Sequence, residues 1–161
     1  MSTDKKNELK QKLAQSKQAL EVVLNTLSPE QWEVKVFSEE SNWTIKEIVA
    51  HLIDGETGMS IQVHKVRKGR ETVPEGFDLD TWNNSLQKRW GEIPTPTTLM
   101  QKLAETRAKT LENLDTIKDE EWTLQGRHPS QGILTIEQYY LTIAGHEAIH
   151  TEDIRKAVDG G

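Results

Sequence analysis

Two histidines near the C-terminus carry the clearest chemical signal in the sequence. Residues 145–150 read Gly-His-Glu-Ala-Ile-His, so His146 and His150 are four positions apart. On a helix this spacing places both side chains on one face, and paired imidazoles of this kind are typical ligands of a zinc-like metal. Two core histidines satisfied by hydrogen bonds are the alternative. Metal binding is favoured because both lie in one stripe at helical spacing, made of Ile136, Tyr139, Ile143, His146, His150, Ile154 and Ala157.

A metal site needs at least a third protein ligand, with a position left open if the site is catalytic. His51 is the best candidate, because it lies near the middle of a second predicted helix and beside Ile48 of its apolar stripe. It can therefore reach inward between helices. We predict a divalent-metal site formed by His51, His146 and His150.

The other two histidines are expected to be solvated. His64 lies late in the second predicted helix, next to Lys65, Arg67, Lys68 and Arg70. That basic run is typical of an exposed helix end that is favoured by the helix dipole. His128 lies in a Gly-Arg-His-Pro segment that reads as a loop.

Glu147 is the candidate catalytic residue. It follows His146 within the apolar stripe, where a carboxylate is costly to bury unless something compensates it. A water molecule or thiol on the metal could compensate it, which would make Glu147 a general base or a hydrogen-bond acceptor beside the site. The alternative is a solvated position, or a salt bridge to a Lys or Arg of a neighbouring helix.

Several enzyme classes are excluded by pattern. His146-Glu147-x-x-His150 matches the zincin signature, but only eleven residues follow His150 and none is a histidine. No strand-rich half is predicted that could hold a peptide substrate. The sequence contains no Gly-rich phosphate loop and no serine nucleophile elbow, and it lacks the two Glu-x-x-His pairs of di-iron bundles.

Four long periodic segments must position these residues, and none reads as a strand. They run from about 4 to 27, from 44 to 68, from Thr95-Pro96 to about 117, and from 135 to 158. Each would span about 35 Å at about 1.5 Å per residue. Helices of matched length with apolar stripes predict an all-α four-helix bundle. A long connection, Gly69 to Pro96, separates the second and third helices and contains a short helix that Asp78 or Asp80 caps.

The chain also repeats itself. Leu27-Ser-Pro-Glu-Gln-Trp32 leads through a loop into Trp43-Thr-Ile-Lys-Glu47, and Ile117-Lys-Asp-Glu-Glu-Trp122 leads through a similar loop into Leu134-Thr-Ile-Glu-Gln138. Both second segments are predicted capping boxes. The two halves of the bundle therefore read as copies of one helix–loop–helix unit.

Composition narrows the function classes. The 161 residues are expected to form one domain, 1–161, and the absence of cysteine excludes disulfides and thiolate sites. A net charge of −6 argues against nucleic acid or an acidic membrane as partner. The polar start has no secretory signal pattern and no window is apolar enough to span a membrane. We expect a cytoplasmic protein.

These motifs resemble those of the DinB/YfiT-like superfamily of four-helix bundles. The resemblance covers nearly the whole chain and rests on three segments: Trp43-Thr-Ile-Lys-Glu-Ile-Val-Ala-His51-Leu, Phe77-Asp-Leu-Asp-Thr-Trp-Asn83 and Gly145-His146-x-x-x-His150-x-x-Asp153-Ile154. It implies an up-down-down-up bundle and a metal triad of His51, His146 and His150. Zinc or nickel would fill this triad ahead of manganese or iron. Asp153 departs from the pattern, which usually has Gln there.

The resemblance also sets the expected function. Bacillithiol S-transferases and mycothiol-dependent maleylpyruvate isomerase are relatives, which implies chemistry on low-molecular-weight thiols and a small-molecule substrate. A metal-dependent enzyme, either a thiol-dependent S-transferase or a hydrolase, is therefore expected. The alternative is a non-catalytic, stress-related bundle that binds a metal or ligand. A homodimer is expected mainly from the resemblance, with five tryptophans available for a contact.

Overall fold

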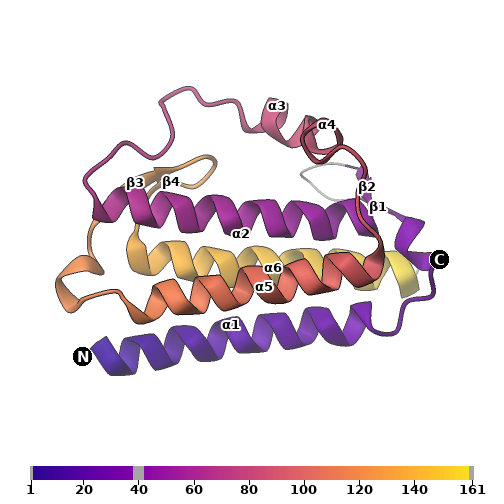
Figure 1. The fold of residues 1–161 in the computed structure, drawn as a ribbon, viewed down its shortest axis with the longest axis horizontal. Coiled ribbons are helices and arrows are strands. Elements are labelled where there is room, and N and C mark those ends of the chain that lie inside the picture. Colours follow the sequence, from indigo (N-terminus) through magenta and orange to yellow (C-terminus); the bar gives the residue numbers. More distant parts are fainter. Residues whose placement is uncertain (1, 38–41, 160–161) are drawn as a thin grey trace.

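Four long helices lie side by side in the computed structural model, which describes residues 2–37 and 42–159 (Figure 1). Two of them, α1 and α6, run in one direction, and the other two, α2 and α5, run in the opposite direction (Figure 1). The predicted all-α four-helix bundle with up-down-down-up topology is confirmed. The helices are α1 (Ser2–Leu24), α2 (Ile45–Arg67), α5 (Pro96–Asp115) and α6 (Ile136–Asp159).

The segments that lead into α2 and α6 have the same construction. A 3-10 turn, η1 (Gln31–Glu33), precedes the hairpin of β1 (Lys35–Phe37) and β2 (Asn42–Thr44). In the second half η2 (Asp119–Glu121) precedes the hairpin of β3 (Gln125–His128) and β4 (Gly132–Thr135). Both hairpins are antiparallel. The predicted repeat is confirmed, and all four long segments are helices as predicted. The two hairpins lie between them and were not predicted, because strands of three or four residues are too short to show a period of two.

Matching hydrogen bonds begin the two helices. The Ile45 N–H donates to the Val34 carbonyl, and the Ile136 N–H donates to the Leu124 carbonyl. Thr44 and Glu47 form a complete capping box at α2. At α6 the backbone N–H of Thr135 donates to the Gln138 side chain and that of Gln138 donates to the Thr135 hydroxyl, 2.8 and 3.1 Å. Both predicted capping boxes are confirmed.

The core consists of two apolar clusters, one toward each end of the bundle. Each is closed by a tryptophan of one repeat: Trp32 and Trp122 are both about 4% exposed. The first cluster includes Leu20, Ile45, Ile48, Val49, Leu99 and Ile154, and the second includes Leu13, Val63, Leu114, Ile136 and Tyr139. Buried polar side chains lie between the two clusters, at about the same level along the bundle as the histidines.

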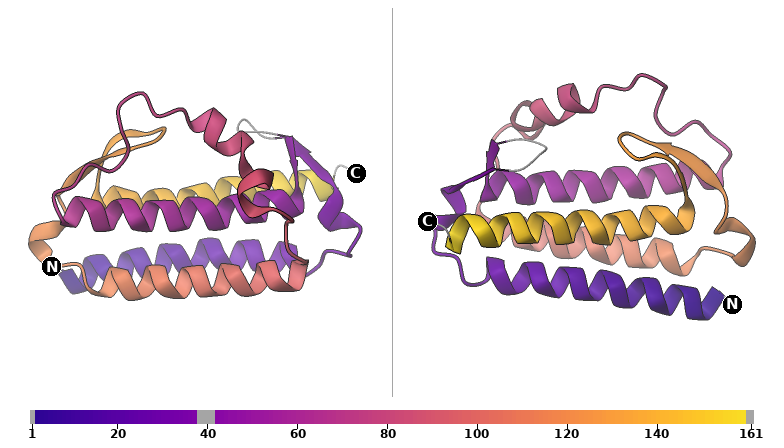
Figure 2. Two further views of the ribbon diagram at one scale, coloured as in Figure 1. Left: turned by 45° about the horizontal axis from the view of Figure 1, so that its top comes forward. Right: turned by 180° about the vertical axis from the view of Figure 1, so that it is seen from behind.

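The connection between α2 and α5 returns along the whole bundle, because these two helices run parallel (Figure 2). It carries two short helices, α3 (Leu79–Asn84), capped by Asp78, and α4 (Leu86–Trp90). The Asp54 carboxylate on α2 fastens it by accepting hydrogen bonds from Arg89 at 2.7 Å and from the Trp90 indole at 3.0 Å. The predicted short helix is present as two, broken at Ser85.

Candidate metal centre

Three histidine rings from α2 and α6 meet within the bundle. The Nε2 atom of His51 lies 3.1 Å from Nε2 of His146, which lies 3.1 Å from Nε2 of His150. The candidate ligand atoms of all three lie within 4.8 Å of one another. The rings meet edge to face, with centroids 4.6 to 5.2 Å apart. The three residues that the sequence selects are thus brought together.

The geometry fits one divalent ion. Metal–nitrogen bonds of about 2.0–2.1 Å place adjacent ligand nitrogens about 2.9–3.4 Å apart, from octahedral to tetrahedral arrangements. Both Nε2 separations fall in this interval. Three imidazoles suit zinc, nickel, copper or iron. Within residues 2–37 and 42–159 the cluster consists of these three histidines.

Two neighbours contact the rings. The Asp153 carboxylate lies 3.3 Å from His150 Nδ1, one turn further along α6. This contact lacks the geometry of a hydrogen bond, so it places a negative charge beside the edge of the ring that carries Nδ1. The Trp43 ring packs against His51, with centroids 4.6 Å apart. Asp153 therefore supplies a carboxylate contact in place of the glutamine that the family pattern has there.

A cavity of about 470 Å³ opens beside the histidines. Its floor includes three glycines of α2 and α6, Gly55, Gly58 and Gly145. A Cβ at Gly55 would lie 3.4 Å from the His146 ring, whereas Gly58 and Gly145 face open space. Glycine within a helix lowers stability by roughly 1 kcal/mol relative to alanine. At these three positions the absence of a side chain leaves more space in the cavity.

The roof of the cavity comes from outside the four long helices. Phe77 and Trp82 of the connection line one side, and the tip of the β3–β4 hairpin, residues 128–131, lines another. The two roof segments lie over the same face of the bundle in Figure 2. Trp82 is 45% exposed and stacks on Arg89, whose guanidinium carbon is 3.8 Å from the ring centroid. Two of the clustered histidines, His51 and His146, line this cavity.

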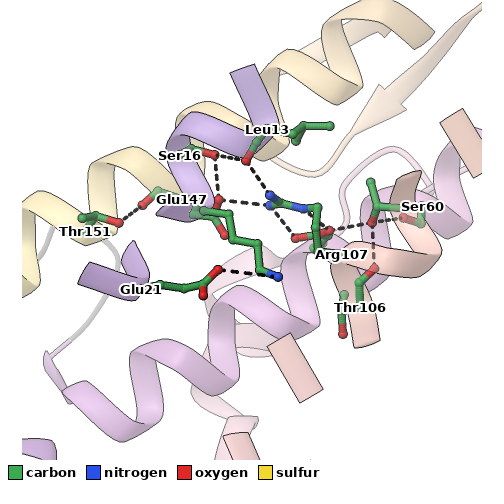
Figure 3. Close-up of polar contacts among 11 residues, drawn as sticks. Leu13, Ser16, Glu21, Ser60, Thr106, Arg107, Glu147 and Thr151 are labelled. Atoms are coloured by element: carbon green, nitrogen blue, oxygen red, sulfur yellow. Dashed lines mark hydrogen bonds and ion pairs between the residues drawn. The ribbon is translucent and has the colours of Figure 1, made fainter. Parts of the chain in front are cut away.

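Glu147 does not line this cavity. Figure 3 shows its side chain between the helices, beside Arg107 and Ser16. Its Oε1 accepts hydrogen bonds from Arg107 of α5 at 3.0 Å and from the Ser16 hydroxyl of α1 at 2.6 Å. Burial raises the pKa of Glu147, and the Arg107 charge and these bonds offset only part of that rise. This geometry matches the salt-bridge alternative. A catalytic role for Glu147 stays a prediction.

Arg107 is the centre of a network that links all four helices (Figure 3). It is 3% exposed and makes a two-bond contact with Glu56 of α2, at 2.9 and 3.0 Å. It also donates to the Leu13 carbonyl of α1 at 2.8 Å. The sequence did contain a signal for this residue, because Leu99, Leu103, Arg107, Thr110 and Leu114 follow the helical period and all are buried.

The predictions for the two remaining histidines have different outcomes. His64 is exposed, as expected. His128 is half-buried and lines the cavity, so the expectation of a solvated loop histidine is wrong. Burial, with the nearby His146, lowers the pKa of His128 to about 4. Local sequence could not show this, because the hairpin brings His128 back over α6 only after the second half folds.

A four-helix bundle with a histidine cluster between α2 and α6 defines a known class of proteins. The chain belongs to the DinB superfamily, whose model matches residues 8–154. No curated protein matches the sequence. None of the helices in the described ranges is long and apolar enough to cross a membrane.

Solved structures share the fold at low identity. YfiT from Bacillus subtilis, a probable metal-dependent hydrolase, is 18% identical with a TM-score of 0.70 and covers 99% of this chain and 90% of its own. The mycothiol-dependent maleylpyruvate isomerase is 15% identical with a TM-score of 0.71, covering 91% of this chain and 60% of its own.

A third neighbour bears on partners. The colibactin self-resistance protein ClbS, solved in complex with a dsDNA, is 15% identical with a TM-score of 0.75 and covers 94% of each chain. The expectation that nucleic acid is not a partner therefore finds no support among these structures.

Proposed function

We propose that this protein is a metal-dependent enzyme that activates a low-molecular-weight thiol, or water, for transfer to a small-molecule substrate. One observation carries the proposal: His146 Nε2 lies 3.1 Å from the Nε2 atoms of both His51 and His150, beside a cavity of about 470 Å³. A structural metal site is normally closed by four protein ligands, whereas a catalytic site keeps a position open. Within the described ranges this cluster has three ligands.

The residues of the chain divide the work. His51, His146 and His150 would hold a divalent ion, with zinc or nickel ahead of manganese or iron. Such an ion supplies Lewis acidity, which lowers the pKa of a thiol or water. Asp153, 3.3 Å from His150 Nδ1, would accept the N–H of that ring when Nε2 binds the ion. Trp82 and the hairpin tip form part of the roof of the cavity.

Thiol-dependent S-transfer and hydrolysis are the two reaction types that this site supports. Among structures with this fold, the maleylpyruvate isomerase is mycothiol-dependent and YfiT is a probable metal-dependent hydrolase, which supports both candidate chemistries. A non-catalytic, stress-related metal- or ligand-binding bundle is the remaining candidate. The open cavity beside the ligands favours an enzyme over it.

A thiol-transfer and hydrolysis screen tests the proposal. Protein stripped of metal is reconstituted with zinc, nickel or manganese and assayed with small thiols and electrophilic substrates. We expect turnover only in reconstituted protein and loss of turnover in H146A. The matched control is H64A, which changes an exposed histidine outside the cavity and should retain turnover. A metal-replete protein without turnover in either assay would favour the non-catalytic bundle.

A further inference from the structure

The hydrogen bonds at the tip of the β3–β4 hairpin fix the proton of His128. Its Nδ1 accepts from the backbone N–H of Ser130 at 3.0 Å and from that of Gln131 at 3.1 Å. A nitrogen that accepts hydrogen bonds carries no proton, so the neutral ring must carry its proton on Nε2. Burial also lowers the pKa of His128 to about 4, which keeps the ring neutral at pH 7.

The hairpin that carries His128 is held firmly against α2. Thr72, in the connection that follows α2, donates a hydrogen bond to the Arg127 carbonyl at 2.7 Å. Gly126 lies so close to the helix that a Cβ there would be 2.4 Å from the Val66 side chain. The bonds to Nδ1 and these two contacts fix the position of the ring from both sides. His128 is therefore a preorganised group and not a side chain of a free loop.

The cavity leaves space for a ligand beside the His128 ring. His128 lines it together with His51 and His146, and Nε2 of His128 has no hydrogen-bond partner among residues 2–37 and 42–159. Gln62 lines the same cavity, is 8% exposed, and its Oε1 lacks a partner in the described chain. A buried polar atom without a partner, as Gln62 Oε1 is, costs stability unless a ligand satisfies it. The half-buried His128 lines the same cavity, so a polar ligand there could reach both groups.

We propose that His128 binds the substrate by donating its Nε2–H to an oxygen acceptor, a carboxylate or carbonyl, while the reacting end of the substrate lies at the histidine cluster. This inference rests on the proposed function, since it assigns the same cavity to the same substrate. Substrates or thiol cofactors that carry such an oxygen near the sulfur are selected over plain alkyl ones. His128 is a specificity residue and not a metal ligand.

Matched thiol pairs test the inference. Cobalt(II)-loaded protein is titrated with mercaptoacetate against ethanethiol, and with 3-mercaptopropionate against propanethiol, following the thiolate absorption band. In H128A the affinity for at least one acid should fall about tenfold, as expected for a hydrogen bond to a charged group. The affinity for the alkanethiol of equal length should change by less than about twofold. H128Q, which retains a donor, should recover part of the loss, and H64A should match the wild type.

The outcomes separate the two proposals. Equal losses for acid and alkanethiol, or no loss for either acid, would overturn the role of His128 while leaving the metal site intact. Wild-type protein that binds cobalt(II) but no thiol would contradict the proposed thiol chemistry, and the wild type alone shows that failure. In that case acetate is added and the His128 Nε2–H proton is followed by NMR. A shifted signal supports donation, and an unmoved signal overturns it.

A second measurement needs no ligand. Nitrogen-15 NMR of the ring reports its tautomer and charge directly. We expect a neutral ring with the proton on Nε2 at pH 7. A proton on Nδ1, or a cationic ring at that pH, would overturn the inference whatever the thiols do.

Discussion

His51 Nε2 on α2 lies 3.1 Å from His146 Nε2 on α6, although 95 residues separate them in the chain. The internal repeat explains the meeting. The two helices are equivalent elements of the two halves, each begun by the same hairpin and capping box, and they pack side by side (Figure 2). Histidines in the first half of one helix and the middle of the other therefore reach the same point of the bundle.

Replacing Arg107 with Met should lower the free energy of unfolding by about 3–5 kcal/mol, because Glu56 and Glu147 would then be buried without their cation. Urea unfolding measures this change. K109M, on the exposed side of the same helix, is the control and should differ from the wild type by less than about 0.5 kcal/mol. An R107M variant as stable as K109M would contradict the network.

Glu147→Gln should retain fold and metal, because the carboxylate contacts Ser16 and Arg107 and does not line the cavity. If Glu147 is instead a general base, turnover falls by roughly a hundredfold or more with metal retained. Turnover and metal content of E147Q, measured together, decide between these roles.

The same variant predicts a pH effect on stability. Burial raises the pKa of Glu147 in the fold above its ordinary value of 4.5. The folded chain thus holds this proton at a pH where the unfolded chain has lost it, so the wild type loses stability as pH rises above 4.5. E147Q lacks this loss, and its stability relative to wild type should rise over that range. Chemical unfolding between pH 4.5 and 7 checks the slope.

His128 predicts the opposite dependence. Its pKa is about 4 in the fold, against 6.5 ordinarily. Between pH 6.5 and 4 His128 binds a proton in the unfolded chain but not in the folded chain. The wild type therefore loses stability as pH falls from 6.5 to 4. H128Q should lose less over that window when the two are unfolded in parallel. Identical slopes would contradict the neutral ring.

A homodimer stays a prediction. Three of the five tryptophans, Trp32, Trp43 and Trp122, are buried in the bundle, which leaves the exposed Trp82 and the half-buried Trp90 for a contact. Sedimentation at tens of micromolar should show a species of twice the chain mass. A single 18.4 kDa species would contradict it.

The helices and the histidine triad could be predicted from the sequence because both follow helical periodicity, which is a local property. His146 and His150 share a face whatever the rest of the chain does, and His51 follows from the repeat. The hairpins could not be predicted because strands of three or four residues are too short to show an alternating pattern. The position of His128 could not be predicted because it depends on contacts between residues far apart in the sequence, such as the hydrogen bond between Thr72 and Arg127.

Elemental analysis of the purified protein tests the metal site most directly. Protein expressed with added zinc, nickel and manganese should carry one divalent ion per chain, and a variant with His51, His146 and His150 changed to alanine should carry none while H64A keeps its ion. Because imidazole binds a metal only when neutral, affinity should fall steeply below about pH 6. A metal-free wild type, or a triple variant with the same metal content as wild type, would contradict the account.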